Sequence, residues 1–202
     1  MSVLVIVAHP DRGSFNHAIA ETAVRVLQRN GYSVRFRDLY REEFPPVLPG
    51  EEIPKGATLP GGIGEHCAEV ASARGFVIVH PNWWGQPPAI LKGWIDRVFR
   101  PGAAYEFEEG DGGEGVPVGL LKAEAAVVFN TSNTPPAREL ELFGDPLETI
   151  WRSCIFGLCG VKHFSRKTFS VVVTSTGEQR ATWLREAEET VDKHFPAAIA
   201  VD

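Results

Sequence analysis

The chain has 202 residues, of which 44% are hydrophobic and 23% charged, and it carries a formal net charge of -6. This length fits one globular domain, residues 1–202, that buries its core without disulfides or a metal ion. The acidic balance gives no electrostatic reason to expect nucleic acid or an anionic membrane surface as a partner.

The cysteines and the amino terminus indicate the compartment. Cys67, Cys154 and Cys159 are odd in number and lack CxxC spacing, which is typical of reduced thiols. The apolar run of residues 1–7 is short and has no basic flank, so neither a signal peptide nor a membrane-spanning helix is expected. We therefore expect a cytoplasmic protein without membrane insertion.

The first part of the chain predicts a strand, a helix and a second strand. Residues 3–8 form a continuous apolar run, as a strand buried on both faces of a parallel sheet requires. Helical spacing of apolar residues follows from Phe15 to Leu27 and stops at Asn30 and Gly31, a common helix end. Residues 33–39 then predict the second strand.

The rest of the chain continues this alternation. The Pro- and Gly-rich residues 44–64 predict a surface loop, and residues 65–74 predict a short helix. Residues 108–115 are acidic and glycine-rich, which predicts a mobile loop, with a functional lid as the less favoured alternative. Further strands are predicted at residues 76–79, 125–129 and 168–173, and further helices at residues 89–99, 139–158 and 178–194.

Five strands that alternate with helices predict an α/β protein with a mostly parallel sheet. Right-handed crossovers make a doubly wound sheet with helices on both faces the natural arrangement. Five strands favour the flavodoxin-like strand order 2-1-3-4-5 over a six-stranded dinucleotide-binding fold. In such sheets a ligand binds beyond the carboxyl ends of the strands where the strand order reverses, here between the first and third strands.

The segment after the first strand has the chemistry of an anion site. Arg12, Ser14 and Asn16 surround the expected start of the first helix, where free N–H groups and the helix dipole favour a phosphate. The alternative is that Ser14 only caps the helix and that His9 only ends the strand. The segment has neither GxGxxG nor a P-loop motif, and the glycines within residues 61–64 follow no predicted strand.

The segment after the third strand is aromatic. Pro81, Asn82, Trp83, Trp84 and Gly85 place two large rings in an otherwise polar loop. Such a loop favours a flat partner, and an isoalloxazine ring is one. The alternative is that both tryptophans belong to the core or to an interface.

A third polar segment follows the fourth strand at the same edge of the sheet. It consists of Asn130, Thr131, Ser132 and Asn133. These side chains either hydrogen-bond the carbonyl groups of a bound ring or form a simple Asx-type turn. We include all four in the expected cofactor site.

At four places the sequence resembles the NAD(P)H:quinone oxidoreductase family and its small bacterial relatives, which include modulators of drug activity and ancillary proteins of potassium-efflux channels. The resemblance runs over residues 3–160, and the block at residues 88–99 is the most specific part. The matching blocks are Ala8-His9-Pro10 with Ser14-Phe15-Asn16, Pro81 to Trp84, Pro88-Ala89-Ile90-Leu91-Lys92-Gly93-Trp94-Ile95-Asp96-Arg97-Val98-Phe99 with Ala104-Tyr105, and Gly119-Leu120-Leu121-Lys122.

The resemblance implies a flavoprotein oxidoreductase that uses NAD(P)H as electron donor. FMN is the expected cofactor and FAD the alternative, because family members that hold FAD tend to be longer. By resemblance, His9, Phe15 and Asn16 contact the ribityl phosphate region, residues 81–84 line the isoalloxazine ring, and Tyr105 faces the nicotinamide or the quinone.

The resemblance also implies a homodimer with the active site near the subunit interface. It implies a ping-pong cycle in which NAD(P)H reduces the flavin before a quinone-like acceptor takes two electrons. One stacked position would serve donor and acceptor in turn. Two alternatives stay open: a flavodoxin-like electron carrier without a nicotinamide site, and a flavin- or nucleotide-responsive regulatory subunit of a partner protein.

The chain departs from the family pattern in two places. Family members commonly read Thr-Thr-Gly-Gly where this chain has the four polar residues that begin at Asn130. Ala137 and Phe143 occupy the positions of a Tyr and a His that well-known quinone reductases use to handle the charge of hydride transfer. Neither side chain can donate a proton, so the sequence assigns no catalytic acid or base.

Overall fold

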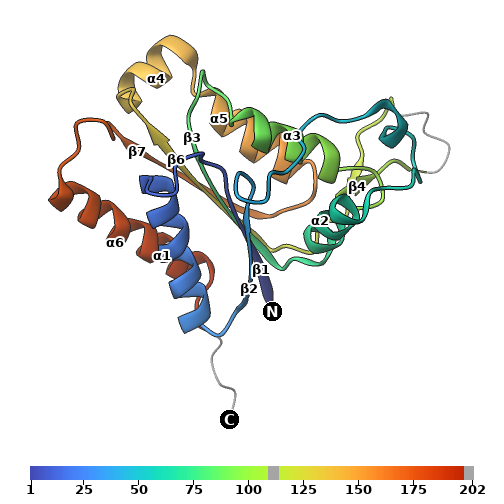
Figure 1. The fold of residues 1–202 in the computed structure, drawn as a ribbon, viewed down its shortest axis with the longest axis horizontal. Helices are drawn as coiled ribbons and strands as arrows, with labels where there is room; N and C mark the ends of the chain where they lie inside the picture. Colours follow the sequence, from blue (N-terminus) through green and yellow to red (C-terminus); the bar gives the residue numbers. More distant parts are fainter. Residues whose placement is uncertain (109–113, 198–202) are drawn as a thin grey trace.

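A computed structural model of the chain describes residues 1–108 and 114–197. Its centre is a parallel sheet with the order β2-β1-β3-β6-β7, which confirms the predicted flavodoxin-like order 2-1-3-4-5 (Figure 1). The strands are β1 (Ser2–Val7), β2 (Ser33–Asp38), β3 (Gly75–Pro81), β6 (Ala125–Ser132) and β7 (His163–Ser170).

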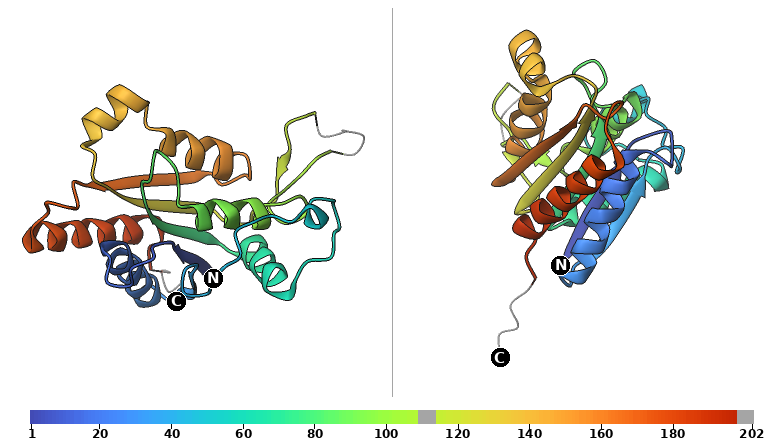
Figure 2. Two further views of the ribbon diagram at one scale, coloured as in Figure 1. Left: turned by 45° about the horizontal axis from the view of Figure 1, so that its top comes forward. Right: turned by 90° about the vertical axis from the view of Figure 1, so that its left-hand side faces the viewer.

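Helices cover both faces of this sheet, as expected (Figure 2). One layer consists of α1 (Phe15–Arg29) and α6 (Gly177–His194), whose apolar side chains share one core cluster. The other consists of α2 (Gly61–Ser72), α3 (Ala89–Val98) and the π-helix η2 (Ile150–Gly157), which share a second cluster. The central strands therefore have apolar layers on both sides.

The sequence of β1 shows why the sheet can be covered twice. Successive side chains of a strand point to opposite faces. Val3 and Val5 accordingly lie in the cluster with α1 and α6, whereas Leu4 and Ile6 lie in the other. All residues of β3 and β6 are buried as well, which explains why these strands read as continuous apolar runs.

The first helix begins and ends where the sequence predicts. Ser14 is the N-cap, and its hydroxyl oxygen accepts a hydrogen bond from the backbone N–H of His17. Gly31, after the last turn, has a left-handed backbone with φ of 86°. The helix therefore presents its N-terminus at the carboxyl end of β1.

Helix α2 corrects the prediction for residues 61–64, which lie in its first turn and not in a loop. Its apolar positions, among them Ile63 and Val70, pack into the core and outweigh the low helix propensity of glycine. Within the segment expected to be a loop, a short 3-10 helix η1 (Gly50–Glu52) also forms.

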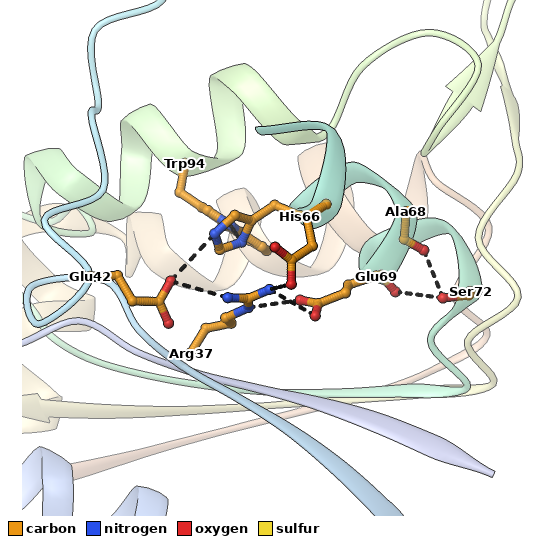
Figure 3. A network of polar contacts seen from close by, with 8 residues as sticks. Arg37, Glu42, His66, Ala68, Glu69, Ser72 and Trp94 are labelled. Carbon is orange, nitrogen blue, oxygen red and sulfur yellow. Dashed lines mark hydrogen bonds and ion pairs between the residues drawn. The ribbon is translucent and has the colours of Figure 1, made fainter. Parts of the chain in front are cut away.

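A polar network fastens α2 to the edge of the sheet (Figure 3). Arg37 on β2 donates two hydrogen bonds to the carboxylate of Glu69, at 2.8 and 2.9 Å, and one of 2.6 Å to Glu65. His66 accepts a hydrogen bond of 3.1 Å from the indole of Trp94 on α3. Because Nδ1 accepts, the second nitrogen of His66 carries the proton and faces Glu42 at 3.4 Å.

The helix predicted over residues 139–158 is interrupted. The structure has α4 (Pro136–Phe143), α5 (Pro146–Thr149) and η2 in its place. Gly144 and Asp145 have positive φ angles of 67° and 49°, and Pro146 cannot continue a preceding helix. Apolar periodicity persists across this break, which is why the sequence reads as one helix.

The last strand starts earlier than predicted. Strand β7 covers His163–Ser170, so it shares only residues 168–170 with the expected strand at 168–173. The charged side chains of Arg166 and Lys167 stand in the middle of β7, which is an edge strand, and Arg166 donates a hydrogen bond to the buried Asn130. Strands β3 and β6 are likewise longer than predicted and include His80 and Pro81, and Asn130 to Ser132.

A short hairpin of β4 (Tyr105–Glu106) and β5 (Val118–Gly119) was not anticipated. The expected lid or mobile loop at residues 108–115 falls largely on residues 109–113, which lie outside the described residues. Among the helices of the described ranges, none combines the length and apolarity needed to cross a bilayer.

Candidate functional site

A cavity of about 470 Å³ opens at the carboxyl ends of the central strands. It lies where the strand order reverses between β1 and β3, which is the position expected for a ligand in this class of sheet. The lining residues are His9, Asp11, Gly13, Ser14, Phe15, Asn16, Pro81, Asn82, Trp83, Thr131, Ser132, Asn133, Thr134, Val172, Val173 and Arg180.

The N-terminus of α1 forms one end of the cavity. The first backbone N–H groups of the helix, at Phe15 and Asn16, have no acceptor within the helix. The loop before it is held by Asp11, whose carboxylate accepts from Gly13 N–H and whose carbonyl accepts from Ser14 N–H. Free N–H groups and the positive end of the helix dipole make this end suitable for an anion.

Arg180 on α6 adds a cation to the same cavity, and the sequence analysis missed it. Its Nε donates to Ser175 Oγ at 2.8 Å, one terminal nitrogen donates to the Val172 carbonyl at 3.2 Å, and the guanidinium lies over the Phe15 ring at 6.0 Å. These contacts fix the guanidinium, and within the described ranges it has no ion pair with a carboxylate. Arg180 lies outside the block that carries the family resemblance, so only the fold brings it here.

The segment after β3 forms an aromatic wall. Pro81 and Trp83 line the cavity, and the Trp83 ring lies 6.3 Å from the ring of His9 across the opening. Asn82 holds the segment in place, because its backbone N–H donates to the Thr131 carbonyl at 2.7 Å. Burial lowers the pKa of His9, which favours the neutral ring in the free protein.

A strained turn follows this wall. Trp83 and Gln86 exchange two backbone hydrogen bonds of 3.1 and 3.0 Å, and the residues between them, Trp84 and Gly85, have φ angles of 58° and 70°. Two positive φ angles are normal for glycine and costly for a bulky residue. The Trp84 side chain is fully exposed, so packing against the described part of the chain does not offset this strain. Such strain is frequent at sites of ligand or partner contact.

The end of β6 closes the cavity opposite the wall. Asn16 and Thr131 exchange hydrogen bonds of 3.0 and 3.2 Å between their side chains, which ties α1 to this strand. Ser132 accepts from the backbone N–H of Thr134, and Asn133 accepts from Val173 N–H. The three polar residues that follow Asn130 therefore line the cavity, although Thr131 and Ser132 belong to the strand and not to a loop.

A buried polar network lies beneath the end of β6 and supports it. His80 Nδ1 donates to the Pro81 carbonyl at 2.8 Å, and His80 Nε2 accepts from Trp151 and from Asn130, both at 2.9 Å. Arg166 on β7 donates to the Asn130 amide oxygen at 3.0 Å. Desolvation lowers the pKa of His80 to about 4, so the ring is neutral.

A second hollow of about 390 Å³ adjoins the cavity on the side of α4. Asn82 lines both spaces and donates from its amide to the carboxylate of Glu139 at 3.0 Å. The exposed Phe143 ring, one of the two departures from the family pattern, lines this hollow. The lining is Asn82, Trp84, Gly85, Thr134, Arg138, Glu139, Phe143 and Pro146.

The structure thus separates the predicted site residues into groups. Arg12 is exposed and lies outside the cavity lining, Asn130 lies beneath it, and Trp84 and Gly85 line the second hollow. Tyr105 lies in β4, at the end of the molecule opposite α6 (Figures 1 and 2). The ten that the cavity brings together are His9, Ser14, Phe15, Asn16, Pro81, Asn82, Trp83, Thr131, Ser132 and Asn133.

Comparisons with known proteins agree with this geometry. A family model described as a flavodoxin-like fold matches residues 1–195. The chain is 35% identical over 204 residues to an uncharacterized NAD(P)H oxidoreductase of Haemophilus influenzae, and the alignment covers 98% of each chain.

Solved structures are similar as well. An NAD(P)H:quinone oxidoreductase from Methanothermobacter marburgensis superposes with a TM-score of 0.80 at 26% identity, over 95% of each chain. An FMN-dependent NADH-azoreductase from Bacillus anthracis, solved in complex with FMN, superposes with a TM-score of 0.71 at 19% identity, over 96% of this chain and 99% of that one. At that identity the second likeness concerns the fold.

Proposed function

Because the chain belongs to the family with the flavodoxin-like fold, we propose that it is a flavin-dependent NAD(P)H oxidoreductase that binds FMN in the switch-point cavity. One observation carries the proposal: a helix N-terminus, a fixed arginine and an aromatic wall meet in a single cavity. The similarity to an NAD(P)H oxidoreductase of Haemophilus influenzae supports NAD(P)H as donor, and the FMN complex of the azoreductase supports the cofactor.

The residues present fit FMN. The cavity of about 470 Å³ falls within the range of roughly 300–1,000 Å³ that is typical of small-molecule sites. The N–H groups of Phe15 and Asn16, the Ser14 hydroxyl and Arg180 would hold the phosphate. Pro81 and Trp83 would line the ring, which supplies a two-electron redox centre when bound.

The second hollow is the proposed place for donor and acceptor. Trp84 and Phe143 offer exposed aromatic surface there, and Arg138 and Glu139 offer charge. We propose that NAD(P)H and a quinone-like acceptor use this hollow in turn, as a ping-pong order requires. The side chains of Ala137 and Phe143 have no proton to donate. Backbone N–H groups and the polar residues at the end of β6 would therefore stabilise the negative charge that hydride transfer creates on the bound cofactor.

A homodimer would complete the site. Strand β4, which holds Tyr105, lies at the opposite end of the molecule from α6, whose Arg180 lines the cavity (Figure 1). We therefore propose that a second copy of the chain supplies the Tyr105 that faces the nicotinamide or the acceptor. The fully exposed Trp84 and the exposed apolar side chains of α4, such as Leu140, leave surface beside the cavity for that copy. We therefore propose a symmetric dimer with the site at its interface.

We also propose a cytoplasmic location. All three cysteines are free, and Cys67 and Cys159 are buried. Burial raises the pKa of Cys159 to about 11 and also raises that of Cys67, so neither is poised to form a disulfide. Free, unreactive thiols are typical of reducing compartments.

The test is a titration of the purified protein with FMN, followed by anaerobic addition of excess NADH or NADPH. We expect bound FMN to lose its visible absorbance within a single turnover and to regain it on addition of a quinone. Bound FMN that neither nucleotide bleaches would contradict the oxidoreductase and favour the electron carrier. A protein that binds no FMN would contradict the proposal as a whole.

A further inference from the structure

Three side chains form a hydrogen-bonded chain that leads from the cavity into the protein. Ser14 Oγ lies 3.0 Å from Nδ1 of His17 on α1, and His17 Nε2 lies 3.0 Å from Oδ2 of Asp38 at the end of β2. His17 and Asp38 are buried, whereas Ser14 is half-buried and lines the cavity. A buried carboxylate is therefore linked to the expected phosphate position through one imidazole.

The proton count of His17 decides which way the Ser14 hydroxyl points. An ionised Asp38 only accepts hydrogen bonds, so His17 donates Nε2–H to it. In a neutral His17 the other nitrogen accepts the hydroxyl hydrogen of Ser14, and Ser14 then presents only lone pairs to the cavity. A doubly protonated His17 donates from Nδ1 to Ser14 Oγ, which frees the hydroxyl hydrogen for a ligand.

The surroundings of His17 favour this second state once an anion is present. Asp38 faces it from β2 and is itself held by the backbone N–H of Arg41, at 3.1 Å from its other oxygen. His9 faces it from the loop between β1 and α1, with the ring centroids 6.5 Å apart, and Glu21 follows one turn later on α1. In a dianionic phosphate the free oxygens are all hydrogen-bond acceptors. Such a group therefore favours the doubly protonated His17, in which Ser14 donates its hydroxyl hydrogen to the ligand.

This inference rests on the proposed function of the cavity as an FMN site. We propose that His17 and Asp38 are positioning residues that make Ser14 a hydrogen-bond donor to the FMN phosphate, through uptake of one proton at His17 when FMN binds. The proton comes from solvent and no covalent bond changes. The phosphate stays a dianion, Ser14 donates to it, His17 donates to Ser14 and to Asp38, and Asp38 stays ionised.

The sign of the pH dependence follows from the uptake. Where His17 is neutral in the free protein, binding requires a proton, so FMN affinity falls as pH rises. Because binding takes up one proton, the Kd for FMN increases about tenfold for each unit by which the pH rises in that range. At about pH 8 free FMN phosphate is already a dianion, because the second pKa of such a phosphate is near 6, so its own ionisation does not obscure the uptake.

The experiment is calorimetric titration of the cofactor-free protein with FMN at about pH 8, in buffers of different ionisation enthalpy. Nitrogen NMR of histidine-labelled protein reads the same event at His17. We expect uptake of about one proton, and two protonated ring nitrogens on His17 in the complex but one in the free protein. The variants Asp38→Asn and Ser14→Ala should bind FMN about tenfold more weakly at neutral pH, with uptake near zero.

A control variant and the NMR signals together assign the proton. His194→Gln alters a distant histidine on α6 and should retain the uptake, and the second protonated nitrogen should appear in the signals of His17 and not in those of His9. FMN binding by the unaltered protein without proton uptake would overturn this inference and leave the proposed function intact. Uptake that persists in Ser14→Ala, or a proton that appears at His9 instead of His17, would also overturn it. Failure to bind FMN at all would overturn both.

Discussion

Arg180 is the residue whose removal tests the cofactor site most directly. It is a fixed cation without a carboxylate partner in the described ranges, and it shares the cavity with the N-terminus of α1. Hydrogen bonds to charged groups contribute about 1.5–3 kcal/mol, so Arg180→Ala should weaken FMN binding by roughly 10- to 100-fold. Quenching of tryptophan fluorescence during an FMN titration measures the Kd.

The matched control is Arg185→Ala on the same helix. Arg185 is exposed and, among the residues that the structure describes, donates only to Thr182, so its loss should leave the Kd unchanged. Riboflavin, which lacks the phosphate, should bind the unaltered protein and Arg180→Ala alike. Equal loss of riboflavin and FMN affinity would instead indicate a general disturbance of the cavity.

His80 predicts how stability depends on pH. Burial lowers its pKa from 6.5 to about 4. Between these two pH values His80 is protonated in the unfolded chain but neutral in the folded protein. Stability should therefore fall as pH decreases from about 6.5 to about 4, by up to roughly 3–4 kcal/mol at 1.36 kcal/mol per pKa unit. Urea unfolding at several pH values measures it, and His80→Gln should flatten the slope. An unchanged slope in that variant would contradict the assignment.

At the residue scale, sequence reasoning found most of the cavity but not its cation. Ser14 and Trp83 were accessible because they follow predicted strands at the switch point, where a rule of topology applies. Arg180 comes from α6, which follows Trp83 by almost a hundred residues, and nothing local distinguishes it from the other arginines there. Arg12 was favoured by its neighbours in sequence, but its side chain lies outside the cavity lining.

At the scale of elements, two helical glycines should respond to alanine with opposite signs. A Cβ at Gly93 in α3 would lie 2.1 Å from the carbonyl oxygen of Pro46, whereas a Cβ at Gly64 in α2 meets nothing within 4 Å. Helix propensity alone favours alanine at both by about 0.5–1 kcal/mol. Backbone overlap should reverse this at Gly93, so Gly93→Ala should lose about 1–3 kcal/mol.

Thermal and urea unfolding of Gly93→Ala and Gly64→Ala compare these effects. Gly64→Ala should raise the free energy of unfolding, because alanine has the higher helix propensity. It is therefore the control for the effect of replacing a helical glycine where no contact is disturbed. A stabilised Gly93→Ala would mean that the segment around Pro46 moves away from α3 at little cost. Such an outcome would contradict the close contact between the two backbones.

The elements that could be predicted are those whose pattern is local. Buried strands were recognised as continuous apolar runs, as in β1, and amphipathic helices by a period of 3.6 residues, as in α1. The errors arose where tertiary contacts override the pattern: the charged residues of β7 are satisfied by partners such as Glu148, and the glycines of α2 are compensated by core packing. Local signals also mark the break in the helix predicted over residues 139–158, because Gly144 favours a helix end and Pro146 cannot continue a preceding helix.

At the scale of the whole molecule, the proposed dimer can be tested by complementation. Subunits with Tyr105→Ala keep an intact cavity. Subunits that carry both Ser14→Ala and Arg180→Ala keep an intact Tyr105. A dimer made of either variant alone should oxidise NAD(P)H poorly. In an isologous dimer each site takes its cavity from one chain and its tyrosine from the other. Random mixing gives half mixed dimers with one complete site each, so about a quarter of full activity should return.

Sedimentation of the unaltered protein should first establish the dimer, with a mass of twice the 22.1 kDa of the chain. The control is a mixture of Tyr105→Ala with Tyr105→Phe subunits, which contains no intact tyrosine and should gain nothing beyond the sum of its parts. Activity that fails to return in verified mixed dimers would place Tyr105 outside the site. A monomer with full activity would instead require one chain to hold cofactor, donor and acceptor alone, with Trp84 open to solvent.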